Sequence, residues 1–183
     1  MELDSIEVTT LDGRTTTFGE WAGKVRLVVN VASRCGLAPQ YKALEELQET
    51  YGERGFTVLG FPSNQFLQEY RDTHKIAEYC SATWGVTFPI MAKVWVNGRG
   101  QHPLYRELTK TPDAAGKAGR VTWNFEKFLV MPDGAVHRFR PQTVPDDPSI
   151  VGLIEGAVAP SAPQSQSQSQ SQSQSQAQAQ AQA

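Results

Sequence analysis

Cysteine is scarce in this chain, which has only Cys35 and Cys80 among its 183 residues. Two cysteines so far apart do not form the disulfide framework that small secreted domains need, and they lack the close pairs of structural zinc sites. The three histidines, His74, His102 and His137, show no metal-ligand spacing with each other or with the cysteines. We therefore expect no metal site and no cofactor, and we expect any shared role of the two thiols to be redox chemistry.

Long apolar runs and long charged runs are also missing. Nowhere do about 18 apolar residues follow one another, and the first segment, MELDSIEVTTLDG, has no basic stretch followed by an apolar one. We therefore expect a cytoplasmic protein without a membrane partner. The 17 Lys and Arg residues nearly balance the 19 Asp and Glu residues, for a formal net charge of -2. A chain with this balance has no basic surface that could bind along a phosphate backbone, so we expect no nucleic-acid partner.

The last part of the chain lacks every residue type that builds a core. From Ala159 onward it reads APSAPQSQSQSQSQSQSQAQAQAQA, with no charged, aromatic or branched apolar side chain. Such a tract cannot bury enough surface to offset the entropy lost on ordering. The sequence therefore predicts one domain at residues 1–158 and a disordered tail at 159–183, for which weak self-association or tethering is the only role left open.

The rest of the sequence alternates strand and helix patterns. An Asp12-Gly13 pair between alternating residues predicts a tight hairpin near the N-terminus. The β-branched run KVRLVVNVA, at 24–32, is typical of a strand covered on both faces, and GFTVLGFP at 55–62 repeats that pattern. Apolar residues between the two runs recur every three or four positions, with Gly52 as the expected C-cap. The pattern therefore predicts a β-α-β unit.

Five more elements are expected further along: a helix from Asp72 to Ser81, a strand at 88–98, a short helix at 103–110, a hairpin at 124–139 and a helix after Asp147-Pro148. This order predicts an α/β protein in which a central mixed sheet is flanked by helices and preceded by an N-terminal β-hairpin. Such an arrangement is compatible with a thioredoxin-like fold.

Cys35 lies where the first long strand ends and the helix pattern begins. A free cysteine has a pKa of about 8.5, so only about 3% of it is thiolate at pH 7, and thiolate is the reactive form. The free N–H groups of a helix N-terminus stabilise such an anion, and we expect them and the neighbouring Arg34 to act on Cys35. Position alone leaves a second interpretation open, in which Cys35 is a small hydrophobic packing residue.

Polar residues after the next strand favour a reactive thiol. The segment GFPSNQF ends that strand, and the carboxyl ends of neighbouring parallel strands are where reactive groups gather. We therefore expect Asn64 and Gln65 to lie close to Cys35, although a polar pair after a strand is also typical of a simple turn.

The segment TWNFEKF adds two hydrogen-bond donors, Trp123 and Asn124. Together with Gln65 they are suited to hold a thiolate without a charged base. Because adjacent strand residues point to opposite faces, both donors reach the thiol only if the backbone is irregular there. Core packing is the alternative for Trp123.

Three segments, NVASRCG, GFPSNQF and WNFEKFLV, resemble in this order the signature segments of the glutathione peroxidase family. The resemblance covers roughly residues 4–158. It implies the thioredoxin fold and a peroxidatic role for Cys35, at the position where some members carry selenocysteine. It also implies that Gln65, Trp123 and Asn124 complete the catalytic tetrad.

By the same resemblance Cys80, in IAEYCSATWGVTFPI, corresponds to the resolving cysteine of members that thioredoxin reduces. In the implied cycle the Cys35 thiolate attacks the O–O bond of a hydroperoxide, Cys80 condenses with the resulting sulfenic acid, and thioredoxin reduces the disulfide. A buried helical cysteine without a redox role is the alternative for Cys80.

The chain departs from the family pattern in three places. Ser63 stands where members commonly have a third cysteine, which leaves Cys80 as the only internal partner for Cys35. After NQF the chain continues with LQEYRDTHKIAEYC, without the Pro-Gly of the Gln-Glu-Pro-Gly loop that many members have. The segment 109–123 lacks the insertion that builds the oligomer interface and much of the glutathione site in tetrameric relatives, which favours a monomer reduced by thioredoxin.

The sequence therefore favours a thiol peroxidase that reduces hydrogen peroxide and organic hydroperoxides with thioredoxin. Two alternatives stay open: the same chemistry with glutathione as reductant, and a redox sensor or relay in which oxidised Cys35 passes its disulfide to a partner protein. A metal-binding module is the weakest hypothesis, because the histidines are scattered.

Overall fold

The structure, a computed structural model, describes residues 3–160 of the chain. The tail predicted at 159–183 therefore lies, except for its first two positions, outside the described residues. The strands are β1 (Glu7–Thr9), β2 (Thr15–Thr17), β3 (Val25–Val31), β4 (Phe56–Pro62), β5 (Lys127–Val130) and β6 (Val136–Phe139). The α-helices are α1 (Gln40–Tyr51), α2 (Thr73–Glu78), α3 (Pro103–Leu108) and α4 (Pro148–Ala157).

The central sheet has four strands in the order β4-β3-β5-β6 and is mixed, as predicted. Strands β3 and β4 run parallel, whereas β5 is antiparallel to both β3 and β6. Every residue of β3 and β4 is buried, as the continuous apolar runs predicted. Strands β1 and β2 pair separately as an N-terminal antiparallel hairpin, and Gly13 supplies the positive φ of its turn.

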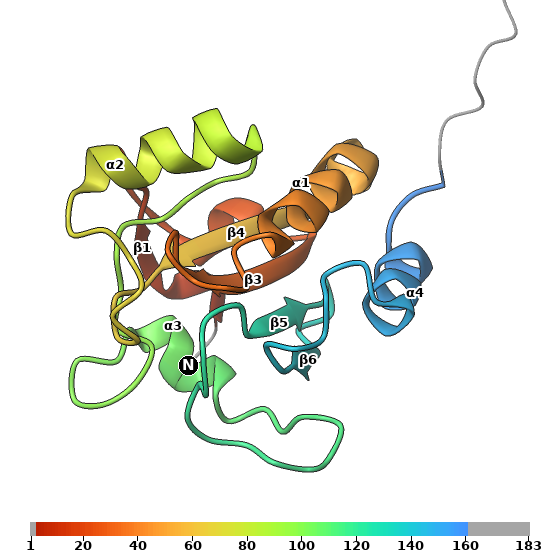
Figure 1. The fold of residues 1–183 in the computed structure, drawn as a ribbon. Helices are drawn as coiled ribbons and strands as arrows, with labels where there is room; N and C mark the ends of the chain where they lie inside the picture. Colours follow the sequence, from red (N-terminus) through yellow and green to blue (C-terminus); the bar gives the residue numbers. More distant parts are fainter. Residues whose placement is uncertain (1–2, 161–183) are drawn as a thin grey trace, which may run out of the picture.

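Alternate residues of β3 enter two different cores, one on each face of the sheet. On one face Leu27 and Val29 belong to a cluster with Leu44 of α1 and Ile150 of α4. On the other face Val28 belongs to a cluster formed with the N-terminal hairpin and α3. Figure 1 shows α1 and α2 on one side of the sheet and α3 on the other. Layers of helix on both sides of a sheet explain why every residue of its central strands is buried, including the polar Arg26, Asn30 and Lys127.

Helix boundaries follow local capping chemistry. The carboxylates of Asp72 and Asp147 accept hydrogen bonds from the first turns of α2 and α4, as predicted. Helix α1 ends at Tyr51 as expected, but Gly52 keeps a helical φ and begins a 3-10 turn. The left-handed glycine that ends this turn is Gly55, with φ of 98°.

The prediction of a strand at 88–98 is wrong. Only isolated bridges occur there, of which two pair Met91 with Thr10 and Ile90 with Gly60. The carbonyl of Pro89 and the N–H of Met91 bond to Gly60 on β4, and the chain then leaves the sheet edge. The apolar side chains of this segment pack into the hydrophobic cores on the two faces of the sheet and do not belong to a strand ladder. This is why the sequence pattern is misleading.

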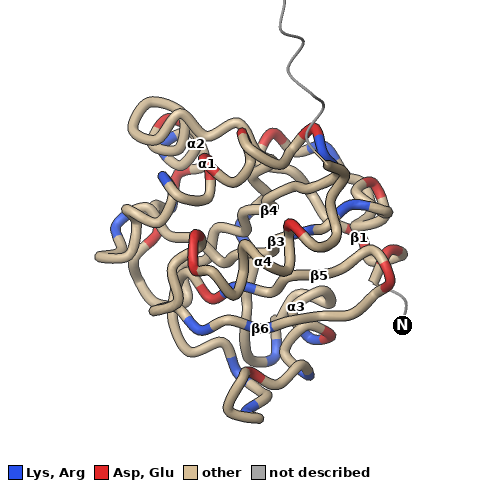
Figure 2. Tube along the Cα trace, turned by 90° about the vertical axis from the view of Figure 1, so that its right-hand side faces the viewer, with Lys and Arg blue, Asp and Glu red and all other residues tan. Residues whose placement is uncertain are grey.

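Basic and acidic residue positions are interspersed along the Cα trace in Figure 2. That distribution agrees with the near-zero net charge of the sequence. Among the helices of residues 3–160, none is both long enough and apolar enough to cross a membrane.

Candidate active site

Cys35 lies in a run of turns between β3 and α1, and not at the helix N-terminus that the sequence suggested. Helix α1 begins only at Gln40, because the preceding residues form successive tight turns. One of these turns bonds the N–H of Ala38 to the carbonyl of Cys35, and another directs the N–H of Leu37 at the Cys35 sulfur, 3.4 Å away. The sulfur therefore faces a main-chain donor, as the mechanism requires, but the donor belongs to a turn. Cys35 is 6% exposed.

The loop after β4 holds the Cys35 turn from the side. The main-chain N–H of Arg34 donates to the carbonyl of Gln68 at 2.9 Å, and the N–H of Ser33 donates to the Glu69 carboxylate at 3.2 Å. The side chain of Asn64 in turn accepts from the N–H of Glu69. Glu69 is fully buried, and this burial raises its pKa, although the hydrogen bonds from Ser33 oppose the shift. The altered loop of this chain is thus firmly attached to the thiol turn.

The side-chain amide of Gln65 is occupied elsewhere. Its Oε1 accepts from the N–H groups of Val96 and Asn97, both at 2.7 Å, and its Nε2 donates to the carbonyl of Asn97 at 3.0 Å. Within residues 3–160 no hydrogen bond joins Gln65 to Cys35. The amide stands in for the strand partner that the 88–98 segment lacks, and a donor role of Gln65 at the thiol stays a prediction.

Gln68 is the amide that the sequence interpretation missed. Its Oε1 accepts from Nδ2 of Asn124 at 3.0 Å, while its carbonyl binds the residue next to Cys35. A signal for it was present in the sequence, because Gln68-Glu69 matches the Gln-Glu of the family loop after NQF. The structure therefore joins the loop after β4 to the WNFEKF segment through Gln68 and not through Gln65.

Trp123 and Asn124 lie in a turn before β5, and the backbone there is irregular, as their shared role requires. Phe125 has φ of 64°, which a bulky residue rarely adopts. Asn124 is fully buried, and its Oδ1 has no hydrogen-bond partner among the described residues. Trp123 is 39% exposed, and its ring lies 5.1 Å from the ring centre of Phe66, in the loop after β4. A core-packing role for Trp123 is therefore not supported.

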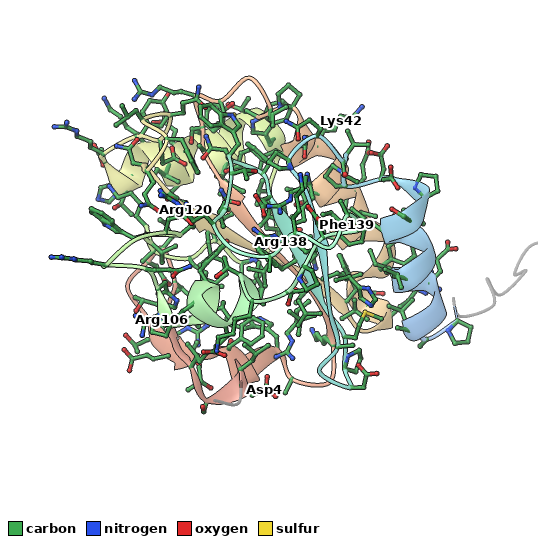
Figure 3. The ribbon with its side chains drawn as sticks, turned by 90° about the horizontal axis from the view of Figure 1, so that it is seen from below. Asp4, Lys42, Arg106, Arg120, Arg138 and Phe139 are labelled. Carbon is green, nitrogen blue, oxygen red and sulfur yellow. The ribbon has the colours of Figure 1, made fainter. Side chains whose placement is uncertain are left out.

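A buried ion pair anchors the segment that leads into Trp123. Arg138 of β6 donates to the Glu126 carboxylate at 2.6 Å and to the carbonyls of Gly119 and Arg120. The same carboxylate accepts from the N–H and hydroxyl of Thr122. In Figure 3, Arg138 lies in the middle of the molecule, whereas Lys42 lies near its edge. The loop before the site is therefore attached to the sheet by fully buried charges.

Cys80 lies in a different environment. It belongs to a π-helical segment, Tyr79–Thr83, that continues α2, and it is 3% exposed. Its thiol donates to the hydroxyl of Tyr41, with 3.7 Å between sulfur and oxygen, and Trp84 stacks on the Tyr41 ring. Burial raises the pKa of Cys80 to about 11, and the nearby Glu69 adds to the shift, while the Tyr41 hydrogen bond opposes it.

Both cysteines are free thiols, and both belong to the core cluster between the sheet and helices α1, α2 and α4. Burial alone does not separate them. The Cys35 sulfur accepts a main-chain hydrogen bond from Leu37, whereas the Cys80 thiol is hydrogen-bonded to the Tyr41 hydroxyl.

A cavity of about 470 Å³ adjoins the loop after β4. Its lining consists of Asn64, Gln65, Leu67, Lys93, Val94 and Trp95. Leu67 and Trp95 are 80% and 62% exposed, which is unusual for large apolar side chains. Within residues 3–160 no group of three or more His, Cys, Asp and Glu side chains is placed to hold a metal ion.

A mixed sheet with a thiol after its central strand defines a protein of the thioredoxin-like class. A solved structure of a thioredoxin-family thiol:disulfide interchange protein from Chlorobium tepidum TLS shares this fold, with a TM-score of 0.60 and 20% identity over 86% of this chain and 95% of that one. Residues 3–109 match the sequence model described as glutathione peroxidase.

Relatives agree with that match. The thioredoxin/glutathione peroxidase BtuE of Escherichia coli (strain K12) is 46% identical over 170 residues, which cover 81% of this chain and 93% of that protein. The crystal structure of Trgpx in apo form has a TM-score of 0.67 and 38% identity, covering 87% of this chain and 99% of that one. The chain therefore belongs to the glutathione peroxidase family and is an enzyme of the peroxidase class.

Proposed function

We propose that the protein reduces hydrogen peroxide and organic hydroperoxides at Cys35, with Gln68, Trp123 and Asn124 as the surrounding donors. The observation that carries this proposal is the position of Gln68. Its main chain binds Arg34, next to the thiol, and its side chain binds Asn124. One residue thus connects the thiol turn with the WNFEKF segment, so that donors from three parts of the chain converge.

The reaction follows from thiolate chemistry. The Cys35 thiolate attacks the outer oxygen of the hydroperoxide, the O–O bond breaks, and the alkoxide or hydroxide leaves with a proton as alcohol or water. Sulfur is oxidised to sulfenic acid while the peroxide is reduced. The N–H of Leu37 and the neighbouring amides stabilise the anion without a charged base.

Asn124 offers an acceptor as well as a donor. Its buried Oδ1 is unpaired, and leaving such an acceptor without a partner costs about 1 to 3 kcal/mol. The O–H of a bound hydroperoxide supplies the missing donor. We therefore assign to Asn124 the orientation of the peroxide before attack.

Cys80 is the proposed resolving residue. Its thiol condenses with the Cys35 sulfenic acid, a disulfide forms and water leaves, and a dithiol reductant then restores both thiols. A thiol with a pKa of about 11 is a poor nucleophile at neutral pH, and Cys80 is 3% exposed and hydrogen-bonded to Tyr41. We therefore expect local opening of the π-helical segment to release Cys80 from its Tyr41 pocket before it reacts.

Thioredoxin is the proposed reductant and the protein is proposed to be a monomer, because the segment 109–123 is short. The name of the Escherichia coli relative includes both thioredoxin and glutathione, which supports a thiol reductant for this chain and leaves the choice to experiment. A cytoplasmic location stays a prediction.

The cavity beside Leu67 supports organic hydroperoxides as substrates. Its volume of about 470 Å³ and its apolar walls, Leu67 and Trp95, suit a hydrocarbon body, and Leu67 directly precedes Gln68. We expect Leu67→Ser and Trp95→Ser to slow the reduction of cumene hydroperoxide more than that of hydrogen peroxide. Exposed Val144 lies outside this lining, so Val144→Ser is the control, and equal slowing of both substrates would contradict a role of the cavity.

Peptide mapping under non-reducing conditions tests the cycle. After one equivalent of hydrogen peroxide we expect a peptide that links Cys35 to Cys80, and steady-state turnover that is faster with thioredoxin than with glutathione. Absence of the linked peptide together with turnover by glutathione would replace the cycle with a one-cysteine mechanism. Trapping of a partner other than thioredoxin by Cys80→Ser would favour a redox relay.

A further inference from the structure

The turn that carries Trp123 and Asn124 contains an unfavourable backbone conformation. Phe125 has φ of 64° and is fully buried, and a bulky residue adopts this left-handed conformation only where its surroundings enforce it. Such residues gather at functional sites, where an exact side-chain direction matters more than local stability. The contacts around Phe125 therefore show what determines the direction of Asn124.

Asn30 of β3 makes most of those contacts. Its side-chain Nδ2 donates to the carbonyl of Trp123 at 3.0 Å, and its Oδ1 accepts from the N–H of Glu126 at 3.1 Å. Its main-chain carbonyl accepts from the N–H of Phe125 at 2.6 Å. One fully buried residue thus binds the turn on both sides of Asn124.

Strand pairing explains why a side chain is needed at this point. The last matched pair between β3 and β5 joins Val29 to Lys127. One residue further, the main-chain N–H of Asn30 still donates to the Glu126 carbonyl, at 3.4 Å. The Asn30 amide adds partners for the Trp123 carbonyl and the Glu126 N–H, which this last stretch of ladder leaves unpaired. On the far side of the turn, the buried ammonium of Lys127 donates to the carbonyl of Phe125 at 2.7 Å, so both polar groups of Phe125 are paired.

We propose that Asn30 is a positioning residue of the peroxidase, whose side-chain amide holds the Trp123–Asn124 turn in register with β3 and hence with Cys35. Asn30 acts through the turn and does not touch the reacting atoms. The proposal rests on the proposed function only in taking Trp123 and Asn124 as the residues that act on the thiol.

A matched control exists in the same protein. Asn97 is also buried, and its side chain also makes one donor and one acceptor hydrogen bond to the main chain. Both bonds go to a single residue, Val121, at 2.9 Å each, so they end before the turn begins. Loss of the Asn97 amide therefore removes as many hydrogen bonds as loss of the Asn30 amide without releasing the Trp123 carbonyl or the Glu126 N–H.

The test compares Asn30→Ala with Asn97→Ala, and adds Asn30→Thr in case the alanine variant does not fold, since a β-branched residue suits a strand. Urea unfolding measures stability, and conditions are chosen in which each variant is folded. Stopped-flow kinetics then measure the second-order rate with hydrogen peroxide and the pH profile of iodoacetamide alkylation at Cys35, both in a Cys80→Ser background.

We expect Asn30→Ala and Asn97→Ala to lower the free energy of unfolding to a similar degree. Only the Asn30 variants should show a peroxide rate that is about ten- to hundredfold lower, because a small misplacement of an orienting group has effects of that size. Their alkylation profile should also move to higher pH. A merely structural role would not move that profile in folded protein.

The proposal is overturned if folded Asn30 variants keep both the rate and the pH profile, or if Asn97→Ala changes them to the same extent. Failure of the proposed function has a different signature. In that case Cys35 of the otherwise unaltered protein would not consume hydrogen peroxide at all.

Discussion

The surroundings of Cys35 and Cys80 differ more than their burial does. Both residues are almost inaccessible, at 6% and 3% exposure. Cys35 follows a strand and lies in turns, where the N–H of Leu37 points at its sulfur, whereas Cys80 lies among aromatic rings and donates a hydrogen bond to Tyr41. Two thiols of similar burial thus have different partners, and the proposed roles of nucleophile and resolving thiol rest on this difference.

Glu69 connects the two regions. Its carboxylate accepts from the main chain beside Cys35, and its charge contributes to the raised pKa values of Cys80 and Tyr41, for which burial is the main cause. Burial, with a smaller contribution from Glu69, thus favours the protonated form of Cys80. In the proposed cycle this pocket delays the reaction of Cys80.

The largest expected effect is at Cys35. Cys35→Ser should abolish peroxide reduction, because a serine hydroxyl is not appreciably ionised at neutral pH and attacks peroxides poorly. The fold should be retained, as circular dichroism and urea unfolding would show. Consumption of hydrogen peroxide by the Cys35→Ser variant at nearly the original rate would assign the chemistry to the other thiol and reverse the comparison.

Cys80→Ser should separate the first turnover from the cycle. One equivalent of peroxide should still be reduced, since the O–O bond is broken at Cys35, whereas continued turnover with thioredoxin should stop. Hydrogen exchange around residues 72–82 should be faster in the oxidised unaltered protein than in the reduced one, because Cys80 has left its pocket. Normal turnover of the variant with thioredoxin would show that an external thiol resolves the sulfenic acid.

Two glutamines of the same loop provide a sharper contrast. Gln68→Ala should lower the peroxide rate by about five- to hundredfold, if one donor or acceptor is worth about 1 to 3 kcal/mol. Gln65→Ala should lower the free energy of unfolding by a similar amount, since it leaves the N–H groups of Val96 and Asn97 unpaired. Its effect on the rate should be smaller. The opposite ranking of the two rates would restore Gln65 as the donor.

The smallest expected effect is a pH dependence of stability. The folded-state pKa of Cys80, about 11, lies above its ordinary value of 9.0, so burial favours the protonated thiol. This contribution is complete below pH 9 and is lost as the pH rises towards 11, with about 1 kcal/mol lost between pH 8 and pH 10. Urea unfolding of the unaltered protein and of Cys80→Ser measures the difference. Equal pH dependence in both would mean that the pocket does not suppress ionisation.

Several features could be predicted because they depend on neighbours in the sequence. The continuous apolar runs predicted β3 and β4, and the Asp-Gly pair predicted the N-terminal hairpin. Asp72 and Asp147 marked the starts of α2 and α4, since a cap bonds to a residue only two positions away. The three signature segments predicted the glutathione peroxidase family, which the family match confirms, whereas the peroxidatic role of Cys35 stays a prediction.

Other features were decided by contacts between distant segments. Gln65 and Gln68 are the same residue type, three positions apart in one loop. Only the fold determines that the amide of Gln65 bonds to Asn97 and the amide of Gln68 to Asn124. The segment 88–98 resembles a strand, yet it bonds to the edge strand β4 only at Gly60 and Pro62, and further along the Gln65 amide bonds to its main chain.

The sequence by itself thus determined the two long strands β3 and β4, the N-terminal hairpin and the helix caps, because periodicity and capping depend on residues within a few positions. Tertiary structure decided which amides surround the thiol, how Asn30 holds Phe125 in a left-handed conformation, and why Cys80 stays protonated. The physical reason is that a hydrogen-bond partner or a desolvated pocket is made by segments that meet only after folding, and local patterns do not rank such partners.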